Sequence, residues 1–203
     1  MVYRQMDPWE RDTRSQWNYL HEKARFFSVF DSFADTVVQQ LEKSVSRTLA
    51  LKGRAGSGKS TLFSHICQLM MQRGWTVLPF FGGNTERSTD AFGILMGLVW
   101  QMETLTGQEH MENQEPDGEY TFTGNLPFRS GKQKAGNHFS LRQWQERLEE
   151  LCARIGETKK VMIAVDALDQ LQESELRDLL GFLPSRRSSK VVCFVTCLEN
   201  HPL

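Results

Sequence analysis

A chain of 203 residues has room for one ordinary domain, and 39% hydrophobic with 24% charged residues is typical of a protein with a buried core, which excludes disorder throughout. The formal net charge of −1 gives no reason to expect nucleic acid or an anionic membrane as a partner. The apolar runs are far shorter than the ~20 residues of a membrane-spanning helix, and the polar N-terminus lacks a signal peptide, so we expect a cytoplasmic protein.

The first elements follow from apolar periodicity. Apolar residues recur every four positions between Phe26 and Val45, which predicts a helix with one face against the core. Residues 47–53, "RTLALKG", predict a short buried strand, and residues 59–74 predict a helix closed by Gly74. We therefore expect an N-terminal helical segment, residues 1–45, followed by a core domain, residues 46–203.

The rest of the chain continues the alternation of strands and helices. Residues 75–83, "WTVLPFFGG", predict a strand in which Pro79 favours an edge or a bulge. Residues 107–139 are polar and without periodicity, which predicts a disordered insertion. The remaining predicted elements are helices over 88–105, 140–156 and 173–183 and strands over 159–168 and 189–198.

The predicted fold class is α/β. Strands such as "VMIAV" and "VVCFV" are continuously apolar and alternate with helices. Strands of this kind are buried on both faces, as in a parallel sheet covered by helices. We expect a three-layer α/β/α fold with a mostly parallel sheet.

A glycine-rich segment stands between the first predicted strand and its helix. Residues 53–61, "GRAGSGKST", match the phosphate-loop pattern GxxxxGK[ST], whose glycines let successive N–H groups point at phosphate oxygens. Lys59 would contact the β- and γ-phosphates and the Ser60 hydroxyl would ligate Mg²⁺. A tight turn with an exposed lysine would leave the full spacing unexplained. The predicted nucleotide-binding residues are Gly53, Arg54, Ala55, Gly56, Ser57, Gly58, Lys59, Ser60 and Thr61.

Three polar residues follow later strands, where parallel sheets bind ligands. Asp166 ends "VMIAVD" and is the expected Mg²⁺ carboxylate, the alternative being a turn residue. Asp169 would orient the attacking water, although an acid at a helix start explains it nearly as well. Thr196 in "FVTCL" would lie beside the γ-phosphate, but a β-branched residue in a strand needs no function.

The combination "LALKGRAGSGKSTLFSHI", "VLPFFGGNTERSTD", "VMIAVDALDQL" and "KVVCFVTCL" resembles the NACHT-type NTPases of the STAND class, above all those of large WD40- or TPR-repeat proteins such as telomerase-associated and nephrocystin-like proteins. The resemblance implies an ATP- or GTP-dependent switch. It assigns Gly53, Gly58, Lys59, Ser60 and Thr61 to the phosphate loop, Asp166 to Mg²⁺, Asp169 to the second acid and Thr196 to a sensor.

The chain departs from the family pattern at several positions. Gln170 stands where many members have glutamate, and Leu198 where many have a sensor arginine, which favours slow hydrolysis. No Gly-Arg pair precedes the helix around Phe33, where the base is usually contacted. The chain also stops at "ENHPL", ahead of the expected fifth strand and lid.

The functional expectation is a nucleoside-triphosphate-binding switch, with ATP favoured over GTP, that hydrolyses its Mg²⁺ complex slowly and regulates assembly of a larger protein. Protein partners or self-association would act through parts outside this chain. The alternatives are a nucleotide-clamped scaffold without turnover and, less favoured, a small-molecule phosphotransferase. A nucleic-acid motor is disfavoured because the charge balance offers no basic track.

Overall fold

The computed structural model describes residues 6–25, 31–43, 48–108, 110, 139–171, 181 and 190–200. Except for Gly181, the predicted helix over 173–183 lies outside the described residues, and so does nearly all of the predicted insertion. Over the described ranges the elements in chain order are α1 (Pro8–Ala24), α2 (Asp31–Lys43), β1 (Thr48–Gly53), α3 (Lys59–Gln72), β2 (Thr76–Phe81), η1 (Glu86–Ser88), α4 (Ala91–Thr106), α5 (Leu141–Thr158), β3 (Val161–Asp166), η3 (Leu168–Gln170) and β4 (Val191–Leu198).

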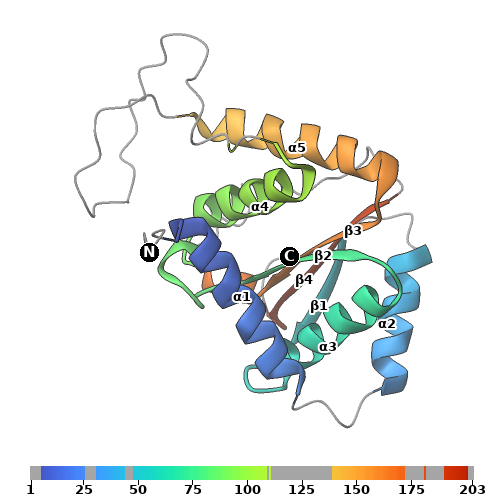
Figure 1. Ribbon diagram of the computed structural model, residues 1–203. Coiled ribbons are helices and arrows are strands. Elements are labelled where there is room, and N and C mark those ends of the chain that lie inside the picture. The colour runs from blue at the N-terminus through green and yellow to red at the C-terminus, as the bar shows by residue number, and fades with distance from the viewer. Residues whose placement is uncertain are drawn as a thin grey trace, which may run out of the picture.

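The four described strands form one parallel sheet in the order β1-β4-β3-β2. The helices lie on both faces, with α4 and α5 on one side and α1, α2 and α3 on the other (Figure 1). The predicted α/β class and its parallel sheet are therefore confirmed. β2 is an edge strand of this described sheet, as Pro79 indicated.

Alternation along the strands divides the buried side chains into two clusters. Ile163 and Val195 face α4 and α5, whereas Ala164 and Phe194 face α1, α2 and α3. Because side chains of a strand alternate between faces, Asp166 and Thr196, two residues beyond Ala164 and Phe194, point to the α3 face. Both therefore lie on the side of the sheet where the helix after the glycine-rich loop begins.

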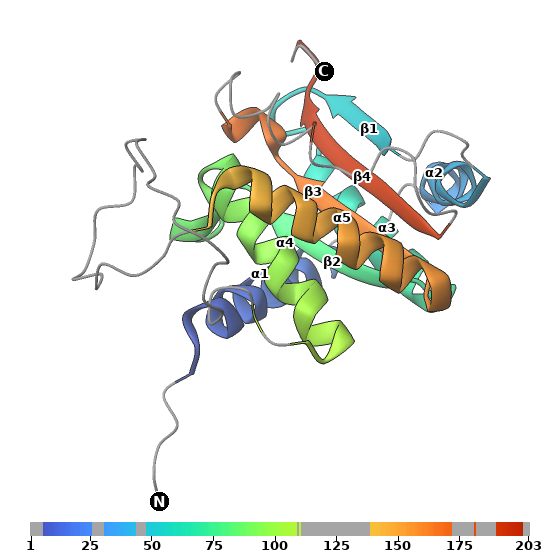
Figure 2. The same ribbon diagram turned by 90° about the horizontal axis from the view of Figure 1, so that it is seen from above.

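Helix α1 is part of this second cluster, although it precedes the segment in which the sequence predicts a specific helix. Asp7 begins α1, since its carboxylate accepts from the N–H of Trp9 at 2.7 Å, and Pro8 occupies the first turn. Leu20 is fully buried among the residues of α2 and α3. In Figure 2, α1 lies at the β2 side of the sheet and α2 at the β1 side. The boundary at residue 45 stays a prediction.

Helices α4 and α5 run in the same direction across the sheet. Near their starts the rings of Phe92 and Trp144 are 6.5 Å apart, and further along Met102 Sδ lies 3.8 Å from Cys152 Sγ. The end of α4 and the start of α5 therefore lie about one helix length apart. His110 lies back beside α4, since its ring stacks on Trp100 at 4.8 Å. This geometry gives a topological reason for a long connection after residue 107.

Candidate functional site

The glycine-rich segment forms a loop between β1, which ends at Gly53, and α3, which begins at Lys59. Gly56 and Gly58 have φ angles of 73° and 83°, a region that side-chain-bearing residues avoid. Gly58 also occupies the N-cap of α3 without a side-chain hydrogen bond. Gly58 therefore provides no side-chain cap for the N–H groups in the first turn of α3. Uncapped N–H groups at a helix N-terminus can donate to a bound anion.

The Lys59 side chain curls over this loop. Its Nζ donates to the carbonyl oxygens of Gly53 at 3.0 Å and Arg54 at 2.8 Å. A Cβ on Gly53 would lie 3.1 Å from Ser57 Oγ and 3.4 Å from Lys59 Cδ, so the absence of a side chain there gives the lysine its path. The ammonium group is therefore held at the loop by two weak neutral acceptors that a phosphate oxygen would outcompete.

Asp166 lies at the end of β3 and is 3% exposed. Its carboxylate accepts a hydrogen bond from the Thr196 hydroxyl, and the Ser60 side chain lies near enough to stabilise its charged form. Burial raises the pKa of Asp166, while the polar groups of Ser60, Thr196 and the Ala167 N–H oppose this rise and the charge of Asp169 adds to it. The hydroxyl at the start of α3 and the carboxylate at the end of β3 thus converge, although 106 positions separate them in the sequence.

Thr196 is fully buried, and its hydroxyl is used twice. It accepts from the N–H of Ala167 at 3.0 Å and donates to Asp166 Oδ1. Ala167 itself has a left-handed backbone with φ 59°. In this structure Thr196 therefore orients the aspartate and the turn after it, and its predicted contact with a γ-phosphate stays a prediction.

Asp169 lies in η3, three residues beyond Asp166, and is partly exposed. Its neighbour Gln170 places its amide Nε2 3.5 Å from Asp169 Oδ2. Asp169, Lys52 and Lys59 all influence the pKa of the buried Cys197 thiol, which burial raises and the two lysines lower. The second acid and the loop lysine therefore both lie near the C-terminal end of β4.

Sequence reasoning missed three contributors to this site. Glu199 follows β4 and pairs with Arg54 at 3.4 Å, but both side chains are largely exposed, so the pair adds little stability. Gly82 follows β2, and a Cβ there would lie 2.9 Å from the Ala167 carbonyl oxygen. Gln16 of α1 accepts from the N–H of Phe81 at 2.9 Å. The glycine pair after "LPFF" could have indicated a close backbone contact at the end of this strand. No local sequence feature indicated a role for Gln16.

The oxygen donors present fit a small divalent cation. Mg²⁺ prefers hard oxygen ligands and is commonly held by one or two protein oxygens together with substrate phosphates. The Ser60 hydroxyl and the Asp166 carboxylate supply such oxygens beside the loop that carries Lys59. Arg54, Ala55, Gly56, Ser57 and Thr61 accompany them on the loop and its helix.

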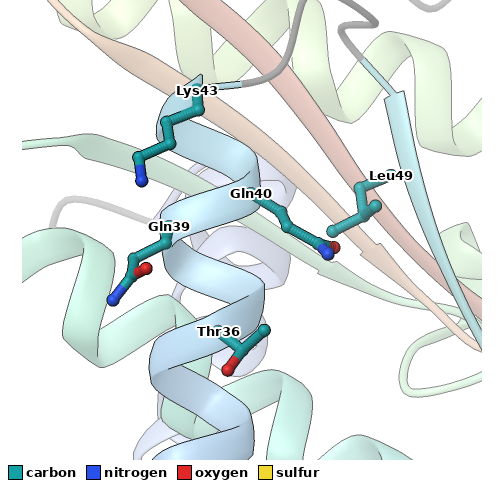
Figure 3. Close-up of a pocket in the computed structure, with 5 residues that line it drawn as sticks. All are labelled: Thr36, Gln39, Gln40, Lys43 and Leu49. Carbon is teal, nitrogen blue, oxygen red and sulfur yellow. The ribbon is translucent and has the colours of Figure 1, made fainter.

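A separate hollow of about 350 Å³ lies between α2 and β1 (Figure 3). Its lining consists of Thr36, Gln39, Gln40, Lys43 and Leu49, and no residue of the glycine-rich loop belongs to it. In the figure Gln40 points toward Leu49, and Gln39 and Lys43 point away from it. The hollow carries one cation, three neutral polar side chains and no acid, so it adds nothing to the phosphate or Mg²⁺ chemistry.

The part of the chain that the structure describes contains no helix long and apolar enough to cross a membrane.

Comparison with known proteins places the chain in a family. The sequence profile described as "Nephrocystin 3, N-terminal" matches residues 31–197. The chain therefore belongs to the nephrocystin 3 N-terminal family. No curated protein matches it significantly.

Eight solved chains are similar to this one. One is PCH-2 of C. elegans, with 15% sequence identity and a TM-score of 0.41. The match covers 85% of the present chain and 37% of that chain, so the present chain spans little more than a third of the length of PCH-2.

Proposed function

We propose that this nephrocystin 3 N-terminal domain binds a Mg²⁺–nucleoside triphosphate, ATP in preference to GTP, and hydrolyses it slowly as a switch of the NACHT (STAND) type. The observation that carries the proposal is the convergence of Ser60 and Asp166, brought together from α3 and β3 beside a glycine-rich loop. A tight turn with an exposed lysine has no need of a buried carboxylate beside the first turn of the next helix.

The roles follow from the chemistry of each group. The N–H groups of residues 53–61 would donate to the α- and β-phosphates, and Lys59 Nζ would exchange its two carbonyl partners for β- and γ-phosphate oxygens. Ser60 and Asp166 would hold Mg²⁺, which when bound neutralises charge on the β- and γ-oxygens. Thr196 would keep the Asp166 carboxylate in position through its hydroxyl.

Hydrolysis needs a water in line with the γ-phosphorus, and Asp169 would orient it. Water would attack phosphorus, the bond to the bridging oxygen would break, and the diphosphate would leave. Most of the rate would come from positioning and charge neutralisation, because the protein contributes no covalent step. The Gln170 amide beside Asp169 is a weaker base than the glutamate of many NACHT proteins, which is consistent with slow turnover.

The first experiment is a titration of the chain with fluorescent ATP and GTP in Mg²⁺. Lys59→Ala should abolish saturable binding, because it removes the ammonium group that would contact the β- and γ-phosphates. The matched control is Lys190→Ala, which removes another lysine that donates to a carbonyl, that of Glu157 at 2.8 Å, but at the opposite end of β4. Equal binding by wild type and Lys59→Ala, with both chains folded, would refute the proposal.

A second candidate function is a nucleotide-clamped scaffold without turnover, favoured by Gln170 and by Leu198 at the sensor position. Long incubation of the complex with Mg²⁺ separates the two functions, because the switch releases phosphate and the scaffold does not. Asp169→Asn should leave the dissociation constant unchanged and lower the rate of phosphate release by at least ten-fold. Phosphate release that requires an added acceptor would instead indicate a phosphotransferase.

The proposal also extends to the setting of the domain. A NACHT-type switch acts within a larger repeat-containing protein in the cytoplasm, through protein partners or self-association. Because these contacts would be made by parts outside this chain, size measurement of the longer protein with and without Mg²⁺–ATP tests self-association. A complex of the longer protein that forms with the triphosphate and dissociates with the diphosphate is the expected result for a switch.

A further inference from the structure

Gln16, on the inner face of α1, completes the edge of the sheet at the end of β2. In the described sheet β2 pairs on one side with β3, so its outward N–H groups need another acceptor. Gln16 is fully buried, and its Oε1 accepts from the N–H of Phe81 at 2.9 Å and from Asn84 Nδ2 at 3.4 Å. Its Nε2 has no hydrogen-bond partner among the described atoms. The side chain therefore acts here through its oxygen alone.

The end of β2 touches the backbone that carries the Mg²⁺ carboxylate. Phe81 is the register partner of Asp166, and the N–H of Gly82 donates to the Asp166 carbonyl oxygen at 3.0 Å. A Cβ on Gly82 would lie 2.9 Å from the oxygen of Ala167 and 3.2 Å from that of Asp166. This contact is close enough that a shift at the end of β2 must move the turn at Asp166 and Ala167.

The same turn determines where the carboxylate points. The Ala167 N–H donates to Thr196, Thr196 donates to the Asp166 carboxylate, and the Ser60 side chain lies beside that carboxylate. A chain of direct contacts thus runs from Gln16 through β2 and the Asp166–Ala167 backbone to the first turn of α3. The first links are a hydrogen bond and backbone contacts, and the last ones pass through the side chains of Thr196, Asp166 and Ser60.

Helix α1 is docked at this place by further contacts. The rings of Tyr19 and Phe81 meet edge to face with centroids 4.8 Å apart, and the Arg87 guanidinium lies 4.8 Å from the Trp9 ring centroid. α1 precedes residues 31–197, which match the family. It thus lies outside the residues that match the family and contacts the end of β2 from there.

We propose that Gln16 is a positioning residue that couples docking of α1 to the Mg²⁺-dependent part of nucleotide binding. The inference rests on the proposed function, because it needs a site for a Mg²⁺–nucleotide complex. Gln16 is linked to the Asp166 carboxylate and not to the phosphate loop. Its removal should therefore lower the gain in nucleotide affinity that Mg²⁺ provides. By linkage, a bound Mg²⁺–nucleotide stabilises the docked position of α1 by the same factor.

The test measures the dissociation constant of fluorescent ATP with Mg²⁺ and with EDTA, in wild type and in Gln16→Met. Methionine has a similar shape but no acceptor for the Phe81 N–H. Loss of one buried hydrogen bond is worth about 1 kcal/mol, so we expect the Mg²⁺-dependent gain in affinity to fall about five-fold. Affinity in EDTA should stay unchanged, because the loop and Lys59 are intact.

Leu20→Ala is the matched control, because Leu20 is equally buried on the same helix and makes no polar contact. It should lower stability without changing the Mg²⁺-dependent gain. Wild type that binds no nucleotide would refute the proposed function itself. Two results would overturn the inference alone while wild type still binds nucleotide. One is a Mg²⁺-dependent gain in affinity that is unchanged in Gln16→Met, and the other is a gain that falls equally in Leu20→Ala.

Amide hydrogen exchange on the wild-type chain gives a second test that needs no variant. Exchange in α1 should slow more when Mg²⁺–ATP binds than when ATP binds in EDTA. α5, in the opposite layer, serves as the reference for global stabilisation. Equal slowing of α1 and α5 by Mg²⁺ would show global stabilisation and would overturn the coupling.

Discussion

The hydroxyl of Thr196 donates to Asp166 Oδ1 and at the same time accepts from the Ala167 N–H at 3.0 Å. The two residues lie on adjacent strands, β4 and β3, at the end of the sheet where the glycine-rich loop also lies. One buried hydroxyl thus holds both the carboxylate and the left-handed turn that follows it. The arrangement links the stability of the C-terminal ends of β3 and β4 to the geometry of the candidate Mg²⁺ site.

Thr196→Val should destabilise the chain and weaken Mg²⁺-dependent nucleotide binding. Valine keeps the shape but leaves the Ala167 N–H without its acceptor and the Asp166 carboxylate with one donor fewer, at a cost of about 2 kcal/mol. Urea unfolding checks the stability. Thr196→Ser retains the hydroxyl and should behave like wild type in binding, and a serine variant as weak as the valine variant would contradict the role of the hydroxyl.

Asp166→Asn should be more stable than wild type at neutral pH. Burial raises the folded-state pKa of Asp166 above its unfolded value. The protonated carboxyl therefore favours folding, and this contribution is complete below the unfolded pKa and lost as pH rises through the folded pKa. Asparagine does not ionise and has no such loss. The difference in free energy of unfolding between Asp166→Asn and wild type should therefore grow with pH across that window and be constant above it.

Urea midpoints of both chains from about pH 4 to pH 8 check this prediction, because the window begins near the ordinary aspartate pKa. The same variant should lose Mg²⁺-dependent nucleotide binding, since an amide is a poor ligand for Mg²⁺. A difference in midpoint that is independent of pH would mean that Asp166 does not titrate with a raised pKa in the folded chain.

Gly82→Ala should disturb the turn at Asp166 and Ala167. The new Cβ would lie 2.9 Å from a carbonyl oxygen, so the end of β2 or the turn must shift, at a cost of about 1–3 kcal/mol. We expect a lower urea midpoint and a weaker Mg²⁺-dependent gain in nucleotide affinity. Gly181→Ala, where nothing lies within 4 Å of the added carbon, is the control. Because alanine is favoured over glycine in a helix, it should not lower the midpoint, and it should leave the Mg²⁺-dependent gain unchanged.

Arg147→Met should destabilise the packing of α4 on α5. Arg147 Nε bonds Glu103 at 2.9 Å, and the Glu103 side chain is 1% exposed, so the substitution removes an ion-pair partner from a buried carboxylate. We expect a loss of about 2 kcal/mol, moderated because the guanidinium is partly exposed. Nucleotide affinity should not change.

The double variant Glu103→Gln/Arg147→Met tests the cause, because it removes the buried charge and should recover most of the loss. Arg142→Ala breaks an exposed pair with Glu146 and should cost less than about 0.5 kcal/mol. If the double variant were no more stable than Arg147→Met, lost packing and not the lost ion pair of the buried carboxylate would be the cause.

The sequence predicted the elements whose determinants are local. The glycine-rich loop depends on backbone conformations that Gly56 and Gly58 adopt without strain, and these are visible as residue types. The caps of α4 and α5 are also local, since Asp90 accepts from Gly93 N at 2.7 Å and Ser140 from Gln143 N at 3.3 Å. The continuously apolar β3 and β4 indicated a parallel sheet for the same reason.

Helix α1 was not predicted as a particular helix because its buried face is partly polar. Trp9, Asp12, Gln16 and Leu20 are buried at helical spacing, but two of the four are polar, which breaks the apolar pattern. Gln16 is buried because β2 offers it the N–H of Phe81, 65 positions away in the chain. No local sequence pattern predicts a hydrogen bond to so distant a residue.

The residue types and spacing therefore determined the α/β class, the loop and the candidate acids, because each depends on short-range backbone preferences and apolar patterning. Tertiary structure alone decided the strand order β1-β4-β3-β2, the contact of Ser60 and Thr196 with Asp166, and the docking of Gln16 on β2. These relationships join distant segments through packing and burial, and their partners exist only once the sheet has formed.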